Sequence, residues 1–82
     1  MTQEIILQGF ETLIHNLSID LRYENGDFTG GLCKIKKKNV LIINTNLSIE
    51  KKINVIADEL KRLNLEQIYI RPMLRQIINK KF

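Results

Sequence analysis

A short apolar run followed at once by a strongly amphipathic helix is the feature that most limits how this chain can fold. The run is Val40-Leu41-Ile42-Ile43, and Ser48 then provides a helix N-cap with Glu50 in the first turn. Apolar residues recur at helical spacing from Ile49 to Leu63, so this helix buries one face. A strand that is apolar on both faces is typical of the centre of a covered sheet. We therefore expect this unit to form the folding core.

The segments around this unit contain further helix and strand patterns. One apolar face at helical spacing predicts a helix from Thr2 or Gln3 to about Asn16, and Pro72 suits the first position of a short last helix. Alternation over residues 19–24 predicts a strand with one buried face. Asn25-Gly26 then indicates a type I′ hairpin turn, with the return strand starting near Asp27-Phe28.

A second hairpin is expected where Lys36 to Asn39 joins two further strand-like segments. Gly30-Gly31 is interpreted as a bulge or bend, because no helix follows that could hold a phosphate. The chain is therefore expected to be a single α+β domain over residues 1–82. Its order is an N-terminal helix, a three-stranded antiparallel meander, a long helix packed on the sheet and a short C-terminal helix. The covered face should collect Leu21, Tyr23, Ile35, and Leu41 or Ile42.

Composition excludes several classes of protein. With 82 residues, 44% of them apolar, the chain is a small globular domain near the size at which association with a second copy helps stability. Cys33 is the only cysteine, which fits a reducing compartment, and His15 falls on the polar side of its helix. There is neither a cationic leader nor an apolar stretch long enough to span a membrane, so a cytoplasmic protein is expected.

The charge pattern leaves a nucleic-acid role open. The net charge is +4, and the densest cluster is the second hairpin, with Lys34, Lys36, Lys37 and Lys38. Together with Lys51, Lys52, Arg71 and Arg75, these residues are the candidate anion contacts. Two observations favour a solvated hairpin tip instead: lysine outnumbers arginine, and no aromatic residue is interleaved for base stacking.

Part of the chain resembles a known enzyme family. Ile43-Asn44 precedes a helix that reads Ile56-Ala57-Asp58-Glu59-Leu60. Over residues 32–63 this order of strand, strand and helix is similar to the minimal zinc peptidases of the ImmA/IrrE type, whose helix contains A-H-E-L-G-H. The resemblance implies that Ala57, Glu59 and Leu60 match the motif, and that the two zinc-binding histidines are replaced by Asp58 and Arg62.

These replacements argue against zinc chemistry. A guanidinium cannot ligate a cation, and Glu59 could act as a base only beside a metal-activated water. No third ligand follows at a suitable distance in the sequence. We therefore expect no catalytic residue, no metal site and no cofactor. The expected function is protein–protein interaction or self-association, with a homodimer as one form; the alternative is nucleic-acid binding through the basic hairpin.

Overall fold

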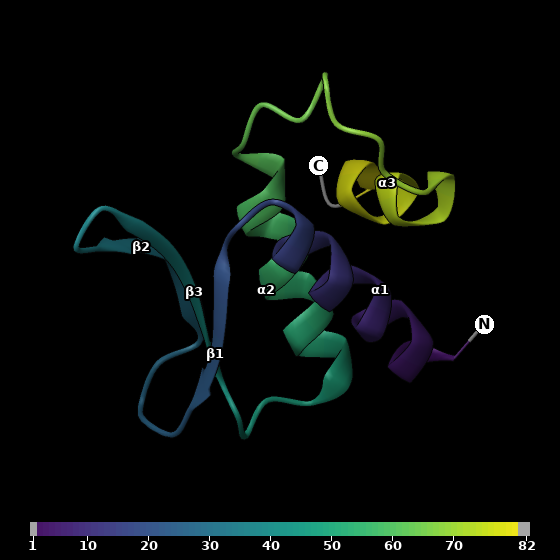
Figure 1. Ribbon diagram of the computed structural model, residues 1–82. Helices are drawn as coiled ribbons and strands as arrows, with labels where there is room; N and C mark the ends of the chain where they lie inside the picture. The colour runs from purple at the N-terminus through teal and green to yellow at the C-terminus, as the bar shows by residue number, and fades with distance from the viewer. Residues whose placement is uncertain (1, 81–82) are drawn as a thin grey trace.

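The computed structural model describes residues 2–80, which form three helices and one sheet (Figure 1). Helix α1 spans Gln3–Asn16, and the Thr2 hydroxyl caps it by accepting a hydrogen bond from the Ile5 amide at 3.3 Å. Helix α2 spans Ile49–Lys61 and is capped in the same way by Ser48. Helix α3 spans Pro72–Lys80. The predicted starts of these helices are confirmed, because capping and apolar spacing are both local properties of the sequence.

The sheet contains three strands in the order β1-β3-β2, which are Asp20–Glu24, Lys38–Asn44 and Gly30–Ile35. β3 is the central strand, as its apolar run predicted. It pairs antiparallel with β2 but parallel with β1, with Leu21 opposite Leu41. The sheet is therefore mixed, and the predicted antiparallel meander is wrong.

The predicted meander fails at the connection that follows β1. Residues 25–29 do not form the predicted hairpin at Asn25-Gly26; they cross the end of β3 and enter β2 on its far side. The Asn44 amide donates to the Thr29 carbonyl, and the Thr45 amide donates to the Glu24 carbonyl, both at 3.0 Å. Long-range pairing of β1 with β3 thus overrides the local turn preference of Asn-Gly. The return strand begins at Gly30, three residues after the predicted start at Asp27.

All three helices lie on one side of the sheet (Figure 1). The core between the sheet and the helices is built from aliphatic side chains and one phenylalanine. Its fully buried members include Phe10 and Ile14 of α1, Leu41 and Ile43 of β3, and Ile56 and Leu60 of α2. Leu21 and Leu32 pack against this core, as do Ile49 and Leu63 at the ends of the α2 stripe.

Two predictions about the faces of the sheet are wrong. Ile35 does not join the covered face; it is 40% exposed on the opposite side, because Leu32 is the β2 residue that points to the helices. A shift of one residue exchanges the two faces of a strand. The central strand was also expected to be covered on both faces. No helix among residues 2–80 lies over the side that carries Val40 and Ile42 (Figure 1), so this face of the sheet has no second layer, although Val40 itself is only 1% exposed and Ile42 is half-buried.

Candidate functional site

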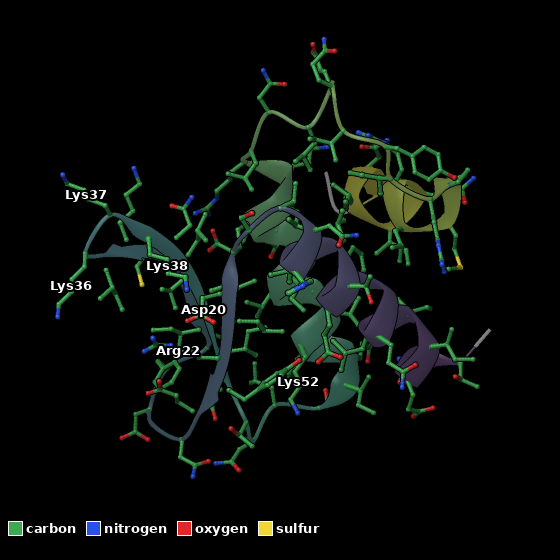
Figure 2. All side chains as sticks on the ribbon, in the orientation of Figure 1. Asp20, Arg22, Lys36, Lys37, Lys38 and Lys52 are labelled. Atoms are coloured by element: carbon green, nitrogen blue, oxygen red, sulfur yellow. The ribbon has the colours of Figure 1, made fainter. Side chains whose placement is uncertain are left out.

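The uncovered side of the sheet, called here the open face, is the candidate functional site. Strand alternation and the observed pairing register define its members. They are Asp20, Arg22 and Glu24 from β1, Cys33 and Ile35 from β2, and Lys38, Val40 and Ile42 from β3. Figure 2 shows Asp20 and Arg22 on the side of the sheet away from the helices, where the Arg22 Nε lies 3.2 Å from the Asp20 carboxylate.

One end of the open face is hollowed. A shallow depression of about 500 Å³ lies where the crossing loop meets β2 and β3. It is lined mainly by Phe28, Gly30, Gly31 and Ile42, with Glu24 at its rim. Gly30 has φ of 146°, and a Cβ atom there would lie 2.5 Å from the Ile42 carbonyl oxygen. Only glycine fits this close approach of β2 to β3.

The side chain of Asn44 holds the loop that forms this hollow. Its Nδ2 donates to the Gly26 carbonyl at 2.9 Å and to the Phe28 carbonyl at 2.7 Å. Its Oδ1 accepts from the Asn46 amide at 2.9 Å. Asn44 is buried, and these three hydrogen bonds satisfy it. As a result Phe28 is held beside the hollow with 39% of its surface exposed, although it is a large apolar residue.

The two ends of the open face differ in charge and shape. The end with the hollow carries the acids Glu24 and Asp27, and residues 24–29 contain no lysine or arginine. The other end is the β2–β3 hairpin, where the exposed Ile35 stands next to Lys38 in the ladder. Lys36 and Lys37 form the turn itself. Between the ends, Asp20 lies opposite Val40 and Arg22 opposite Ile42, and the two charges pair with each other. Apart from this pair, the face has a hollowed end with two acids and a basic end with an apolar projection.

The structure divides the four predicted hairpin lysines between both sides of the sheet. Lys38 projects on the open face, whereas Lys34 alternates with Cys33 and Ile35 and projects on the helix side. Lys36 and Lys37 have φ of 51° and 69°, the left-handed values of a type I′ turn. These residues therefore do not form one continuous cationic surface.

The other predicted cations lie away from the hairpin. Lys52 Nζ lies 5.3 Å from the centre of the Tyr23 ring, at the opposite end of the sheet in Figure 2. Arg75 donates to the carbonyls of Leu65 and Ile68 and so holds the link before α3. Lys51 is exposed in the first turn of α2. Arg71 lines a different groove, beside α1.

Tyr23 joins β1 to both long helices. Its hydroxyl donates a short hydrogen bond to the Glu11 carboxylate of α1, while Lys52 of α2 lies over its ring. Burial, followed by this hydrogen bond and the negative charge of Glu11, raises the pKa of Tyr23 well above its ordinary value. The phenol therefore stays protonated at neutral pH. The geometry is that of a structural clasp between three elements.

The α2 residues that match the peptidase motif lie beside β2. A Cβ atom on Gly31 would lie 3.6 Å from Glu59 Oε1, so this carboxylate is directed at the antiparallel edge strand. Arg62 Nη1 approaches the same Glu59 oxygen at 3.8 Å. Within residues 2–80, no three His, Cys, Asp or Glu side chains gather closely enough to hold a metal ion. His15 is exposed, as predicted, and Cys33 is a free thiol on the open face.

Comparison of the chain with protein-family models, with curated proteins and with solved structures gives no match. No helix in the described part of the chain is long and apolar enough to cross a membrane.

Sequence reasoning did not identify Phe28 and Asn44 as residues of the site. Asn44 directly follows the apolar run of β3, and a polar residue in this place is a sign of a buried hydrogen-bonding position at a strand end. Phe28 has no comparable sign, because its exposure depends on the path of the crossing loop. The hollow is therefore a property of the tertiary structure.

Proposed function

We propose that this protein is a non-enzymatic binding protein that pairs with a second copy of itself through the open face of its sheet. The observation that carries the proposal is the difference between the two ends of this face. One end offers a hollow and two acids, and the other offers an exposed isoleucine and three lysines. Each end is complementary to the other end, and a surface of this kind is self-complementary in a two-fold dimer.

Two-fold symmetry determines which parts of the two open faces meet. A two-fold axis that runs in the plane of the interface, perpendicular to the strands, reverses the strand direction in the second copy. The hairpin of each copy then lies on the hollow end of the other. Ile35 enters the hollow, and the cations of the hairpin approach Glu24 and Asp27. Cys33 stands opposite Val40 in the middle of the ladder, so it lies close to the axis.

The small size of the chain supports the same proposal. A chain of 82 residues has a thin margin of stability, to which burial of Phe28, Ile35 and Ile42 in a dimer adds.

If the chain is related to ImmA/IrrE-type peptidases, it keeps their arrangement of strands and helix without the zinc site. Arg62 stands where a zinc-binding histidine is expected and is close to Glu59, the candidate base. A guanidinium at this position repels a metal ion. We infer that the scaffold serves association and not hydrolysis.

Nucleic-acid binding through the hairpin is the second candidate function. It is favoured by the turn itself, since Lys36 and Lys37 adopt left-handed backbone angles that Asn and Gly adopt at much lower cost. Cations kept at strained positions indicate that their charge is used. Self-association would also use the charge of Lys36 and Lys37, so an experiment must distinguish the two functions. A nucleic-acid site shows affinity that falls linearly with the logarithm of salt concentration.

Sedimentation velocity over a range of protein concentrations tests the leading proposal. Ile35 and Ile68 provide a matched pair, because they are 40% and 37% exposed and Ile68 lies in the link between α2 and α3, outside the open face. We expect a reversible dimer for the wild-type protein and for Ile68→Thr, and a dissociation constant at least about tenfold higher for Ile35→Thr. Equal association of both variants would contradict the proposed interface, and a monomer that shifts only with added oligonucleotide would favour the second candidate.

A further inference from the structure

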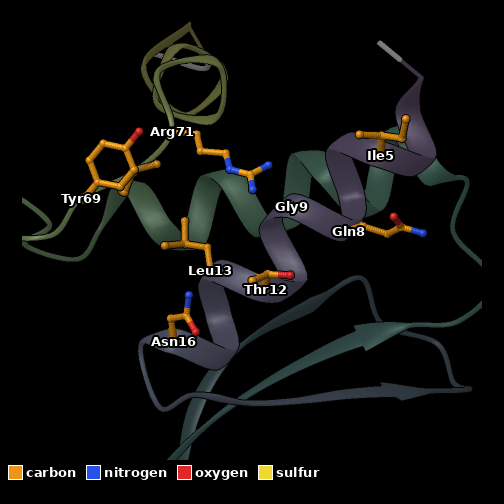
Figure 3. A pocket seen from close by; sticks show the side chains of 9 residues that line it. Ile5, Gln8, Gly9, Thr12, Leu13, Asn16, Tyr69 and Arg71 are labelled. Atoms are coloured by element: carbon orange, nitrogen blue, oxygen red, sulfur yellow. The ribbon is translucent and has the colours of Figure 1, made fainter.

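A second concave surface lies on the helix side of the molecule, remote from the open face (Figure 3). It is a groove of about 380 Å³ between α1 and the link that leads into α3, within the size range of small-ligand sites. Leu13 and Ile70 are buried and form its floor. The polar side chains that line it are Gln8, Thr12 and Asn16 from α1, and Tyr69 and Arg71 from the link.

The groove is created by close packing of α3 on α1. Gly9 allows this approach, because the Leu74 side chain lies 3.3 Å from the place where a Cβ atom of residue 9 would be. Leu74 is buried there, and Pro72 starts α3 two residues earlier. Arg71 is thereby brought against α1 although it is far from α1 in the sequence. A larger residue at position 9 would move the two walls apart.

The hydrogen-bonding side chains of the groove have no partner in the described part of the chain. Gln8, Thr12 and Asn16 follow one another at intervals of four residues, so they lie along one line of α1. Within residues 2–80, none of these three side chains makes a hydrogen bond, and the Arg71 guanidinium has neither a hydrogen bond nor an ion pair. None of the described lining residues is acidic. As far as residues 2–80 are concerned, the groove therefore offers the Arg71 cation without a partner and a row of uncharged donors and acceptors.

Tyr69 adds a flat apolar surface at the rim. Its side chain is 81% exposed, whereas the neighbouring Ile70 is buried in the floor. Figure 3 shows the Tyr69 ring at one end of the groove, while the Arg71 side chain extends along α1. An aromatic residue in this position presents its π-face to a ligand.

We propose that this groove binds a nucleoside monophosphate unit, either free or as the end residue of a nucleic-acid strand. Each part of such a ligand has a counterpart among the lining residues. The Arg71 guanidinium fits a phosphate through two parallel hydrogen bonds. The Tyr69 ring provides a stacking surface for the base. The amides of Gln8 and Asn16 present the donor and acceptor pairs that recognise base edges.

A titration with adenosine 5′-monophosphate, followed by ¹⁵N–¹H NMR, tests this inference. We expect saturable shifts of the Gly9, Thr12 and Arg71 amides. Adenosine and inorganic phosphate each lack one half of the recognised unit, and we expect at least about tenfold weaker binding for both. A short single-stranded oligonucleotide distinguishes the strand end from the free nucleotide, since stronger binding than the monophosphate at the same amides indicates the strand.

Two variants of equal charge provide the control. Arg71→Gln removes the groove cation, and Lys51→Gln removes one exposed cation from the first turn of α2. We expect Arg71→Gln to weaken binding at least about tenfold, the effect of losing a charged hydrogen bond, and Lys51→Gln to leave it unchanged. Both side chains are exposed, so neither variant endangers folding. The inference is overturned if millimolar nucleotide leaves the groove amides unshifted, or if the two variants weaken binding equally. Self-association through the open face is independent of either result.

Discussion

Replacing Asn44 by alanine probes the feature that shapes the open face, the crossing loop of residues 25–29. The side chain makes three hydrogen bonds, of 2.7, 2.9 and 2.9 Å, and two of them hold the carbonyls of Gly26 and Phe28. Each contributes about 0.5–1.5 kcal/mol net. Because the loop is exposed, water can satisfy part of what is lost. We expect Asn44→Ala to lower the free energy of unfolding by about 2–3 kcal/mol.

The loss of unfolding free energy expected for Asn44→Ala is large for this chain. A domain of 82 residues has a total stability of roughly 4–12 kcal/mol. Urea denaturation followed by circular dichroism measures the loss, with the slope of the transition as a check that the unfolded state is unchanged. Asn39→Ala is the matched control. Asn39 lies on the same strand, is exposed, and has no side-chain hydrogen bond in the described part of the chain.

Asn44→Asp separates the donor from the acceptor role. Aspartate keeps an oxygen for the Asn46 amide but cannot donate to the two loop carbonyls, and its charge would face their oxygens. We expect this variant to be at least as unstable as Asn44→Ala at neutral pH, and to recover part of its stability when acid protonates the carboxyl. If Asn44→Ala costs no more than Asn39→Ala, the loop does not depend on Asn44 and the account of the hollow is wrong.

Three further predictions concern stability. Because the pKa of Tyr23 is raised in the folded protein, the unfolded chain loses this phenolic proton first, and the free energy of unfolding should fall as the pH rises above about 10. Urea titration at several pH values should show that Tyr23→Phe removes this fall. The same titration should show that Tyr69→Phe, at an exposed tyrosine, keeps it. Replacing Lys36-Lys37 by Asn-Gly should stabilise the protein by about 1–2 kcal/mol, because these residues tolerate the positive φ of the turn, and thermal unfolding at a salt concentration that screens the lysines should show it. A chelator should leave the melting temperature unchanged, because no three potential ligands gather within residues 2–80, and elemental analysis should find no stoichiometric zinc.

The helices of this protein could be predicted from the sequence because their determinants are local. Thr2 and Ser48 cap their helices as expected, and the apolar spacing identified the buried face of α2. Pro72 begins α3 because its fixed φ suits the first helical turn. The central position of β3 also followed from its sequence, since a short continuous apolar run is typical of an inner strand.

The order of the strands could not be predicted in the same way. Asn25-Gly26 favours a tight hairpin, but the parallel pairing of β1 with β3 joins residues about twenty positions apart and depends on how both strands pack under α1 and α2. Such non-local pairing leaves no sign in a short window of sequence. The same holds for the face of β2, where the choice between Leu32 and Ile35 depends on a register shift of one residue.

The two proposed sites differ in how much of them the sequence contains. The basic end of the open face was evident as a lysine cluster, whereas the hollow depends on the crossing loop. The groove beside α1 joins residues 8–16 to residues 69–71, and no spacing rule connects these segments. The role of Gly9 in bringing them together is visible only once Leu74 is seen against it.

A charge exchange between the two ends of the open face tests the proposed dimer most directly. Glu24→Lys and Lys37→Glu should each weaken the dimer, because like charges then meet, and each contact occurs twice across the two-fold axis. An exposed ion pair contributes up to about 1 kcal/mol, so two lost pairs should raise the dissociation constant roughly tenfold or more. The double variant restores opposite charges at both contacts. Sedimentation equilibrium at low salt should therefore find the double variant close to the wild-type dissociation constant. A double variant that is weaker than either single variant, or a wild-type protein that stays monomeric at every concentration, would contradict the account.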